Sequence, residues 1–93
     1  MDNHGHPFRV RVQNSRSIPL EFRLEPWGEI YEMPADGWFL VEATGPSGDC
    51  LEVEIADNYV TVHGWSGSTA RVFDKNGEVG PADIARPTVP AIE

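Results

Sequence analysis

Along most of the chain, hydrophobic and polar side chains alternate with a period of two. In residues 8–13, FRVRVQ, apolar and polar side chains take turns, and residues 18–25 continue the pattern. Residues 51–55 and 60–63 repeat it. Because successive side chains of a strand point to opposite faces, each stretch predicts a strand with one buried face. Apolar spacing typical of a helix is not sustained in the sequence, so we expect little or no helix.

Turn-forming residues separate these stretches at the intervals that an all-β chain requires. PWG at 26–28, PADG at 34–37 and GPSGD at 45–49 interrupt the alternation. Asp57-Asn58 has the spacing of a two-residue hairpin, in which both residues tolerate positive φ. The pattern predicts an all-β protein, an antiparallel β-sandwich of about seven strands with Greek-key connections.

The alternation also predicts a first strand pairing and a core. Antiparallel pairing of residues 8–13 with residues 18–25 would place Arg9 and Arg11 on the same face as Glu21, Arg23 and Glu25. The inward positions of the predicted strands give the expected core, which consists of Phe8, Val10, Val12, Leu20, Phe22, Leu24, Phe39, Val41, Leu51, Val53, Ile55, Val60, Val62 and Val72.

The length of 93 residues is suited to one domain. We expect the folded domain over residues 7–79, a flexible N-terminus over residues 1–6, and a disordered or loosely packed tail over residues 80–93. The tail has three prolines and no alternation. The alternative is a polyproline II segment that packs on the domain through Ile84.

The charge balance restricts the partners. Fifteen acidic and seven basic residues give a formal net charge of −8. Such a surface repels nucleic-acid phosphates and anionic lipid head groups, so neither partner is expected. The sequence shows no signal peptide and no apolar run long enough to span a bilayer, and the single cysteine has no internal partner. These features predict a cytoplasmic monomer or weak homodimer whose partner, if any, is another protein.

Two patterns have metal-ligand character. His4, His6 and His63 provide imidazoles that suit Zn²⁺ or Cu²⁺, and loss of Met1 would add an amino-terminal copper site at residues 2–4. The segment DKNG at 74–77 matches part of a calcium loop, but Val72 occupies the first ligand position. A tight turn accounts for the same four residues. We therefore predict no metal and no cofactor.

Candidate catalytic residues do not form a complete set. Cys50 and His63 are the thiol–imidazole candidates, but a lone cysteine at a strand start is typical of a small buried hydrophobe. Glu29 and Glu32 are candidate paired carboxylates, and a small sandwich offers them little cleft. We predict that the protein is not an enzyme. A metal-binding or thiol-dependent protein around His63 and Cys50 is kept as an alternative.

Aromatic residues near the turns are the candidate binding residues: Trp27, Tyr31, Trp38 and Trp65. Indoles exposed at strand ends can form the hot spots of a protein interface or stack on sugar rings. Alternatively, they plug the ends of a small core, with the indole N–H donating to a loop carbonyl. We predict a non-enzymatic protein-interaction or accessory module. The alternative is a carbohydrate-binding module that uses the tryptophans at one end of the sandwich.

One combination of motifs resembles a known pattern. Asn14-Ser15, the segment LEPWG at 24–28, Tyr31 and PADG at 34–37 together resemble a pattern in small uncharacterised bacterial all-β proteins. Their spacing is also similar to that of immunoglobulin-like and cupredoxin-like Greek-key sandwiches. The resemblance implies a fold and no activity, because Cys50 lacks the nearby histidine and methionine that cupredoxins use to bind copper.

Overall fold

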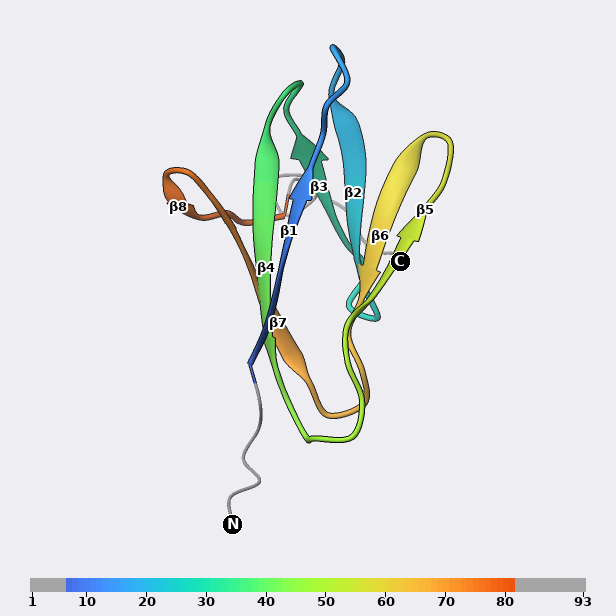
Figure 1. The fold of residues 1–93 in the computed structure, drawn as a ribbon, viewed down its shortest axis with the longest axis vertical. Helices are drawn as coiled ribbons and strands as arrows, with labels where there is room; N and C mark the ends of the chain where they lie inside the picture. Colours follow the sequence, from blue (N-terminus) through green and yellow to red (C-terminus); the bar gives the residue numbers. More distant parts are fainter. Residues whose placement is uncertain (1–6, 82–93) are drawn as a thin grey trace, which may run out of the picture.

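The computed structural model describes residues 7–81, which form two four-stranded sheets packed face to face (Figure 1). In spatial order, the first sheet consists of β1 (Phe8–Gln13), β4 (Trp38–Thr44), β7 (Thr69–Asp74) and β8 (Gly77–Glu78). The second consists of β3 (Glu29–Met33), β2 (Leu20–Glu25), β6 (Tyr59–His63) and β5 (Glu52–Ile55). No helix occurs within residues 7–81. The predicted all-β sandwich is confirmed, with a two-residue eighth strand added.

The predictions for the two ends of the chain fall almost entirely on residues that the structure does not describe, 1–6 and 82–93. The flexible N-terminus predicted over 1–6, the histidines at 4 and 6, and nearly all of the tail, Ile84 included, lie outside the described residues.

The predicted pairing of the first two strands is wrong, because β1 and β2 lie in different sheets. β1 pairs with β4, whereas β2 pairs with β3 and, in parallel, with β6. Arg9 therefore faces Glu42 on β4, with 3.0 Å between Nη2 and Oε2. Alternation shows which face of a strand is buried, but it does not show which strand lies beside it.

Asn14 holds the chain where it crosses from one sheet to the other. Its side chain is 1% exposed. Its Nδ2 donates to the carbonyl oxygens of Ile18 at 2.9 Å and Pro34 at 3.0 Å, and its Oδ1 accepts the Arg16 N–H at 2.9 Å. Its backbone N–H donates to the Gly37 carbonyl at 2.8 Å. One buried amide thus joins the β1–β2 crossover to the β3–β4 turn.

The core lies between the sheets and is centred on aromatic rings. Phe22 and Phe39 meet edge to face with centroids 5.2 Å apart, and Tyr31 contacts both rings. The buried cluster consists of Phe22, Leu24, Tyr31, Met33, Phe39, Val41, Val60, Val62 and Val72. Val10, Val12, Leu20 and Leu51 pack against it while half-buried.

Two residues of the predicted core are in fact exposed. Val53 is 41% exposed and Ile55 is 82% exposed. Both lie on the inner face of β5, because their partners in the ladder are the buried Val62 and Val60. β5 is the last strand of its sheet, and the exposure of these two side chains indicates that the other sheet does not fully cover its inner face. Alternation correctly predicted that Val53 and Ile55 point to the inner face of their sheet, but it did not predict that the opposite sheet leaves them exposed.

Two predicted turns, at residues 57–58 and 74–77, can be compared with the structure. The Ala56 N–H donates to Tyr59 O at 2.9 Å, so Asp57-Asn58 is a two-residue hairpin loop. Neither residue has positive φ, however; Asp36, with φ of 57°, is the non-glycine residue of the described chain that does. In the β7–β8 turn, Asp74 Oδ1 accepts the Asn76 N–H at 2.7 Å and Gly77 has φ of 123°. The DKNG segment therefore forms a turn, as predicted.

Candidate partner-binding surface

The four aromatic residues predicted as binding residues do not meet at one place. Tyr31 is buried in the core. Trp65 packs edge to face against Phe8, which pairs with Ala43 near the end of β4. Trp38 begins β4, at the opposite end of that strand. The tryptophans therefore divide between two ends of the sandwich.

Trp65 and Trp27 have structural contacts around Gly64. Trp65 is 8% exposed, and its Nε1–H donates to the Pro46 carbonyl at 2.8 Å, as the core-plug interpretation expects. Trp27 is 39% exposed and lies over Gly64, where an added Cβ would come within 2.5 Å of Trp27 Cη2. Glycine at this position lets the indole lie against the backbone. Of the two indoles at this end, Trp27 is the exposed one.

Trp38 lies on the outer face of the first sheet, where it begins an apolar row. The ladder places Trp38 beside Gln13, and it places Leu40 between Arg11 on β1 and Phe73 on β7. Trp38, Leu40 and Phe73 are all half-buried. Sequence reasoning missed Leu40 and Phe73 as surface residues. The available signal was β4 itself, WFLVEAT, where apolar residues also occupy positions that alternation assigns to solvent.

Cationic side chains border this row. The Arg11 guanidinium lies 4.4 Å from the Trp38 ring centroid, and that of Arg71 lies 5.2 Å from the Phe73 centroid. At these distances a guanidinium attracts the electron-rich face of an aromatic ring. Within the described residues no salt bridge neutralises Arg11. We call the surface formed by Trp38, Leu40, Phe73, Arg9, Arg11, Arg71 and Lys75 the aromatic–basic face.

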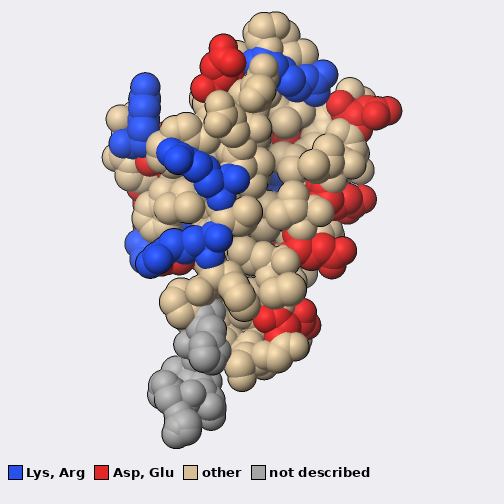
Figure 2. Space-filling model, viewed as in Figure 1, with Lys and Arg blue, Asp and Glu red and all other residues tan. Residues whose placement is uncertain are grey.

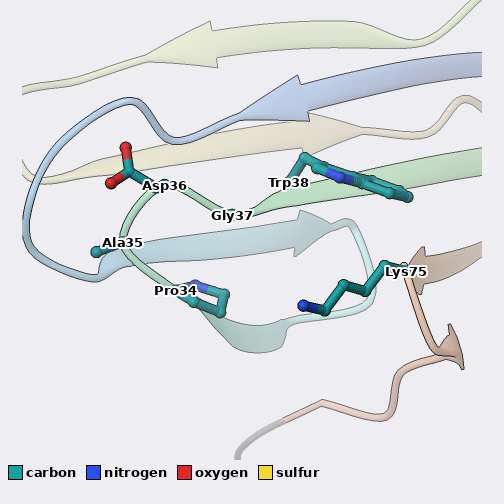
Figure 3. A pocket seen from close by; sticks show the side chains of 6 residues that line it. All are labelled: Pro34, Ala35, Asp36, Gly37, Trp38 and Lys75. Carbon is teal, nitrogen blue, oxygen red and sulfur yellow. The ribbon is translucent and has the colours of Figure 1, made fainter.

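A hollow of about 310 Å³ lies at one end of the aromatic–basic face. It is lined by Pro34, Ala35, Asp36, Gly37, Trp38 and Lys75. Figure 3 shows the Lys75 side chain extending toward the Pro34 ring, while the Asp36 carboxylate points away from the Lys75 amino group. The hollow thus combines an indole and a proline ring with one ammonium group.

The outer faces of the two sheets carry opposite charge. The strands of the first sheet place Arg9, Arg11 and Arg71 outward with Glu42 and Glu78, and Lys75 follows in the β7–β8 turn. The second sheet presents five outward glutamates and one arginine: Glu21, Glu25, Glu32, Glu52, Glu54 and Arg23. Figure 2 shows this separation, with basic side chains over the first sheet and acidic ones along the second. A net charge of −8 therefore conceals one cationic face.

The outer ion pair between β7 and β8 gives a titration prediction. Arg71 Nη2 lies 2.8 Å from Glu78 Oε1, and hydrogen bonding to this arginine lowers the pKa of the Glu78 carboxyl. Since the folded-state pKa is lowered, the pair's small contribution to stability is present at neutral pH and is lost as acid protonates Glu78.

We expect an NMR titration of the Glu78 side-chain carboxyl to give a midpoint below the usual glutamate range. In the Arg71→Gln variant, the midpoint should return to that range, because the charged hydrogen-bond donor is gone. An unchanged midpoint in the variant would show that another group lowers the pKa.

The candidate catalytic and metal-binding residues do not converge within the described chain. Cys50 is exposed, so its predicted burial is wrong, and the structure records no hydrogen bond between Cys50 and His63. His63 Nε2 instead lies 3.3 Å from Glu54 Oε1. Glu29 and Glu32 lie three positions apart on β3 and so point to opposite faces. Residues 7–81 contain no group of three or more His, Cys, Asp or Glu side chains placed to hold a metal ion.

Comparison with known proteins gives no relative. No protein-family model, no curated protein and no solved structure matches the chain. Within residues 7–81, the structure has no helix of the length and apolarity needed to cross a membrane.

Proposed function

We propose that this domain is a non-enzymatic protein-interaction module that binds an acidic, partly apolar partner through the aromatic–basic face. The observation that carries the proposal is the row of Trp38, Leu40 and Phe73 set among cations on an otherwise acidic chain. Aromatic residues and arginine are enriched in the energetic centres of protein interfaces. A cationic face also steers acidic partners during encounter and repels other acidic surfaces less than the rest of the molecule does.

The distribution of the indoles favours this proposal over carbohydrate binding. A sugar-binding platform at one end needs exposed aromatic rings there, and of the two tryptophans at that end Trp65 is buried. Trp27 would have to provide the stacking surface alone. The resemblance to immunoglobulin-like and cupredoxin-like Greek-key sandwiches is compatible with a binding module, but it supplies neither a ligand nor an activity.

The test uses synthetic peptides in which Asp and Glu alternate with Leu and Phe. We expect some of these peptides to bind the full chain and to shift the Trp38 indole and Phe73 backbone resonances in ¹⁵N NMR spectra. Trp38→Ala should weaken binding by about tenfold or more, as expected for a central aromatic contact. Trp27→Ala, which removes an indole at the opposite end, is the matched control and should bind as the unmodified chain does.

Two results would contradict the proposal. One is an equal loss of peptide affinity in Trp38→Ala and Trp27→Ala, which would show that the peptide does not bind specifically at the aromatic–basic face. The other is a Trp27 shift on addition of cello-oligosaccharides with no peptide binding, which would favour the carbohydrate alternative.

A further inference from the structure

Two edge strands of the sandwich carry apolar residues on one side and opposite charges on the other. β1 ends the first sheet and β5 ends the second, and within residues 7–81 neither has a strand on its free side. β1 directs Arg9 and Arg11 outward, and β5 directs Glu52 and Glu54 outward. Their sequences, RVRV at 9–12 and EVEI at 52–55, thus share one alternation with reversed charge.

The inner sides of both strands have apolar surface left uncovered. Ile55 is 82% exposed and Val53 is 41% exposed, although both face the core side of their sheet. Val10 and Val12 of β1 are half-buried. An added strand would therefore cover apolar side chains on one face while its backbone satisfies the unpaired hydrogen-bonding groups of the edge.

The other two edge strands offer less. β8 has only two residues. The inward side chains of β3, Tyr31 and Met33, are already buried in the core. β1 and β5 are consequently the edges with both the length and the free apolar surface for pairing.

Charge then selects between the possible pairings of two copies. Pairing β5 with a second β5 would set Glu52 and Glu54 against the same glutamates, and pairing two β1 strands would set arginine against arginine. Like charges directly opposite one another on paired strands are destabilising. Pairing β1 with β5 sets arginines opposite glutamates and valines beside Val53 and Ile55. The charges on each edge strand therefore disfavour pairing with the same strand of a second copy and favour pairing of β1 with β5.

We propose that the chain associates with itself by pairing β1 of one copy with β5 of another. Either relative strand direction brings Arg9 and Arg11 opposite Glu52 and Glu54. Arg9 already contacts Glu42, and a guanidinium has further N–H donors for a second carboxylate. The two contact surfaces differ, so the contact is heterologous, and a pair joined once retains one free β1 and one free β5 through which further copies can add.

The first experiment is sedimentation equilibrium of the full chain at low salt, at concentrations up to about 1 mM, the range in which weak pairing becomes visible. We expect the average mass to rise above 10.3 kDa with concentration. Amide hydrogen exchange at high concentration should slow on β1 and β5 and not on β3. A mass that stays at 10.3 kDa throughout, or protection on β3 instead, would overturn the proposal.

Charge reversal tests the pairing rule. Glu52→Lys with Glu54→Lys makes both edges cationic, and Arg9→Glu with Arg11→Glu makes both acidic. Each double variant alone should raise the dissociation constant by about tenfold or more. An equimolar mixture should associate again, because each edge of one variant then meets an oppositely charged edge of the other.

The matched control carries the same change of net charge as the Glu52/Glu54 variant, at exposed positions outside β1 and β5, Glu32→Lys with Asp49→Lys. This control should associate as the unmodified chain does, and circular dichroism should show that every variant is folded. Association of the Glu52/Glu54 variant equal to that of the unmodified chain would refute edge pairing. Glu52 and Glu54 lie on the second sheet, outside the aromatic–basic face. The Glu52/Glu54 variant should therefore keep the proposed peptide binding while it loses self-association, so failure of one proposal is distinguishable from failure of the other.

Discussion

Replacing Phe22 with alanine is expected to lower the free energy of unfolding by about 3–5 kcal/mol. Phe22 is fully buried, and its ring makes edge-to-face contacts with both Tyr31 and Phe39. The substitution removes this ring from the centre of the core and leaves a cavity that rigid neighbouring strands fill only in part. Since a domain is typically stable by roughly 5–15 kcal/mol, the substitution should remove a large fraction of the free energy of unfolding.

The control is Ile55→Ala, which removes a large apolar side chain from a position that alternation also predicts to face the core. Because Ile55 is 82% exposed, its loss should change stability by no more than about 0.5 kcal/mol. Urea denaturation followed by circular dichroism measures both values. Equal losses for the two variants would mean that β5 is covered in solution, by another copy or by another part of the chain.

The contrast between Phe22 and Ile55 shows how far alternation can be used to predict this fold. Alternation correctly identified β1, β2, β5 and β6 and the inward face of each, because the backbone geometry of a strand fixes the direction of its side chains. The predicted core included Ile55 because it is apolar and faces inward. Its exposure depends on how far the opposite sheet extends, which is a property of the whole sandwich. A short-range sequence pattern does not show how far the opposite sheet extends over β5.

Strand partners depend in the same way on distant residues. Arg9 and Glu21 looked like cross-strand neighbours because their strands follow one another in the sequence, yet Arg9 pairs with Glu42. The chain changes sheets between β1 and β2, and the buried amide of Asn14 holds that crossover. As a sequence feature, Asn14 is an ordinary turn residue, and its hydrogen bonds to the β3–β4 turn appear only in the folded structure.

The candidate surface was partly predictable. Trp38 was identified as a candidate because large aromatic residues near turns are common in interfaces, whereas Trp65 was identified by the same rule and is buried. What distinguishes them is the position in the fold: Trp38 occupies an outward site of β4, whereas Trp65 follows β6 in a loop, where it packs against Phe8 and its Nε1–H donates to the Pro46 carbonyl. The basic neighbours Arg11 and Arg71 come from β1 and β7, so their meeting with Trp38 and Phe73 requires the sheet order.

Replacing Asn14 is expected to be the most damaging single change among the polar residues of the described chain. Asn14→Ala leaves the Arg16 N–H and the carbonyls of Ile18 and Pro34 without their side-chain partner. Each buried polar group left without a partner costs roughly 1–3 kcal/mol, and water reaching the loop recovers part of this. We expect a net loss of about 2–4 kcal/mol in the free energy of unfolding. Ser17→Ala, an exposed change in the same crossover, should stay within about 0.5 kcal/mol of the unmodified chain.

Asn14→Asp distinguishes loss of hydrogen bonds from loss of packing, because aspartate has nearly the same shape as asparagine. Its carboxylate still accepts the Arg16 N–H, but it turns an acceptor oxygen toward the carbonyls of Ile18 and Pro34. Burial and these oxygens should raise the pKa of the introduced carboxyl in the folded state, since both disfavour its charged form. Relative to the unmodified chain, this variant is therefore least stable at neutral pH and recovers as the pH falls through that raised pKa, whereas the deficit of Asn14→Ala stays constant. Urea denaturation at pH 7 and at pH 4.5 measures the difference, and a pH-independent deficit for Asn14→Asp would show that the side chain at position 14 is accessible to water.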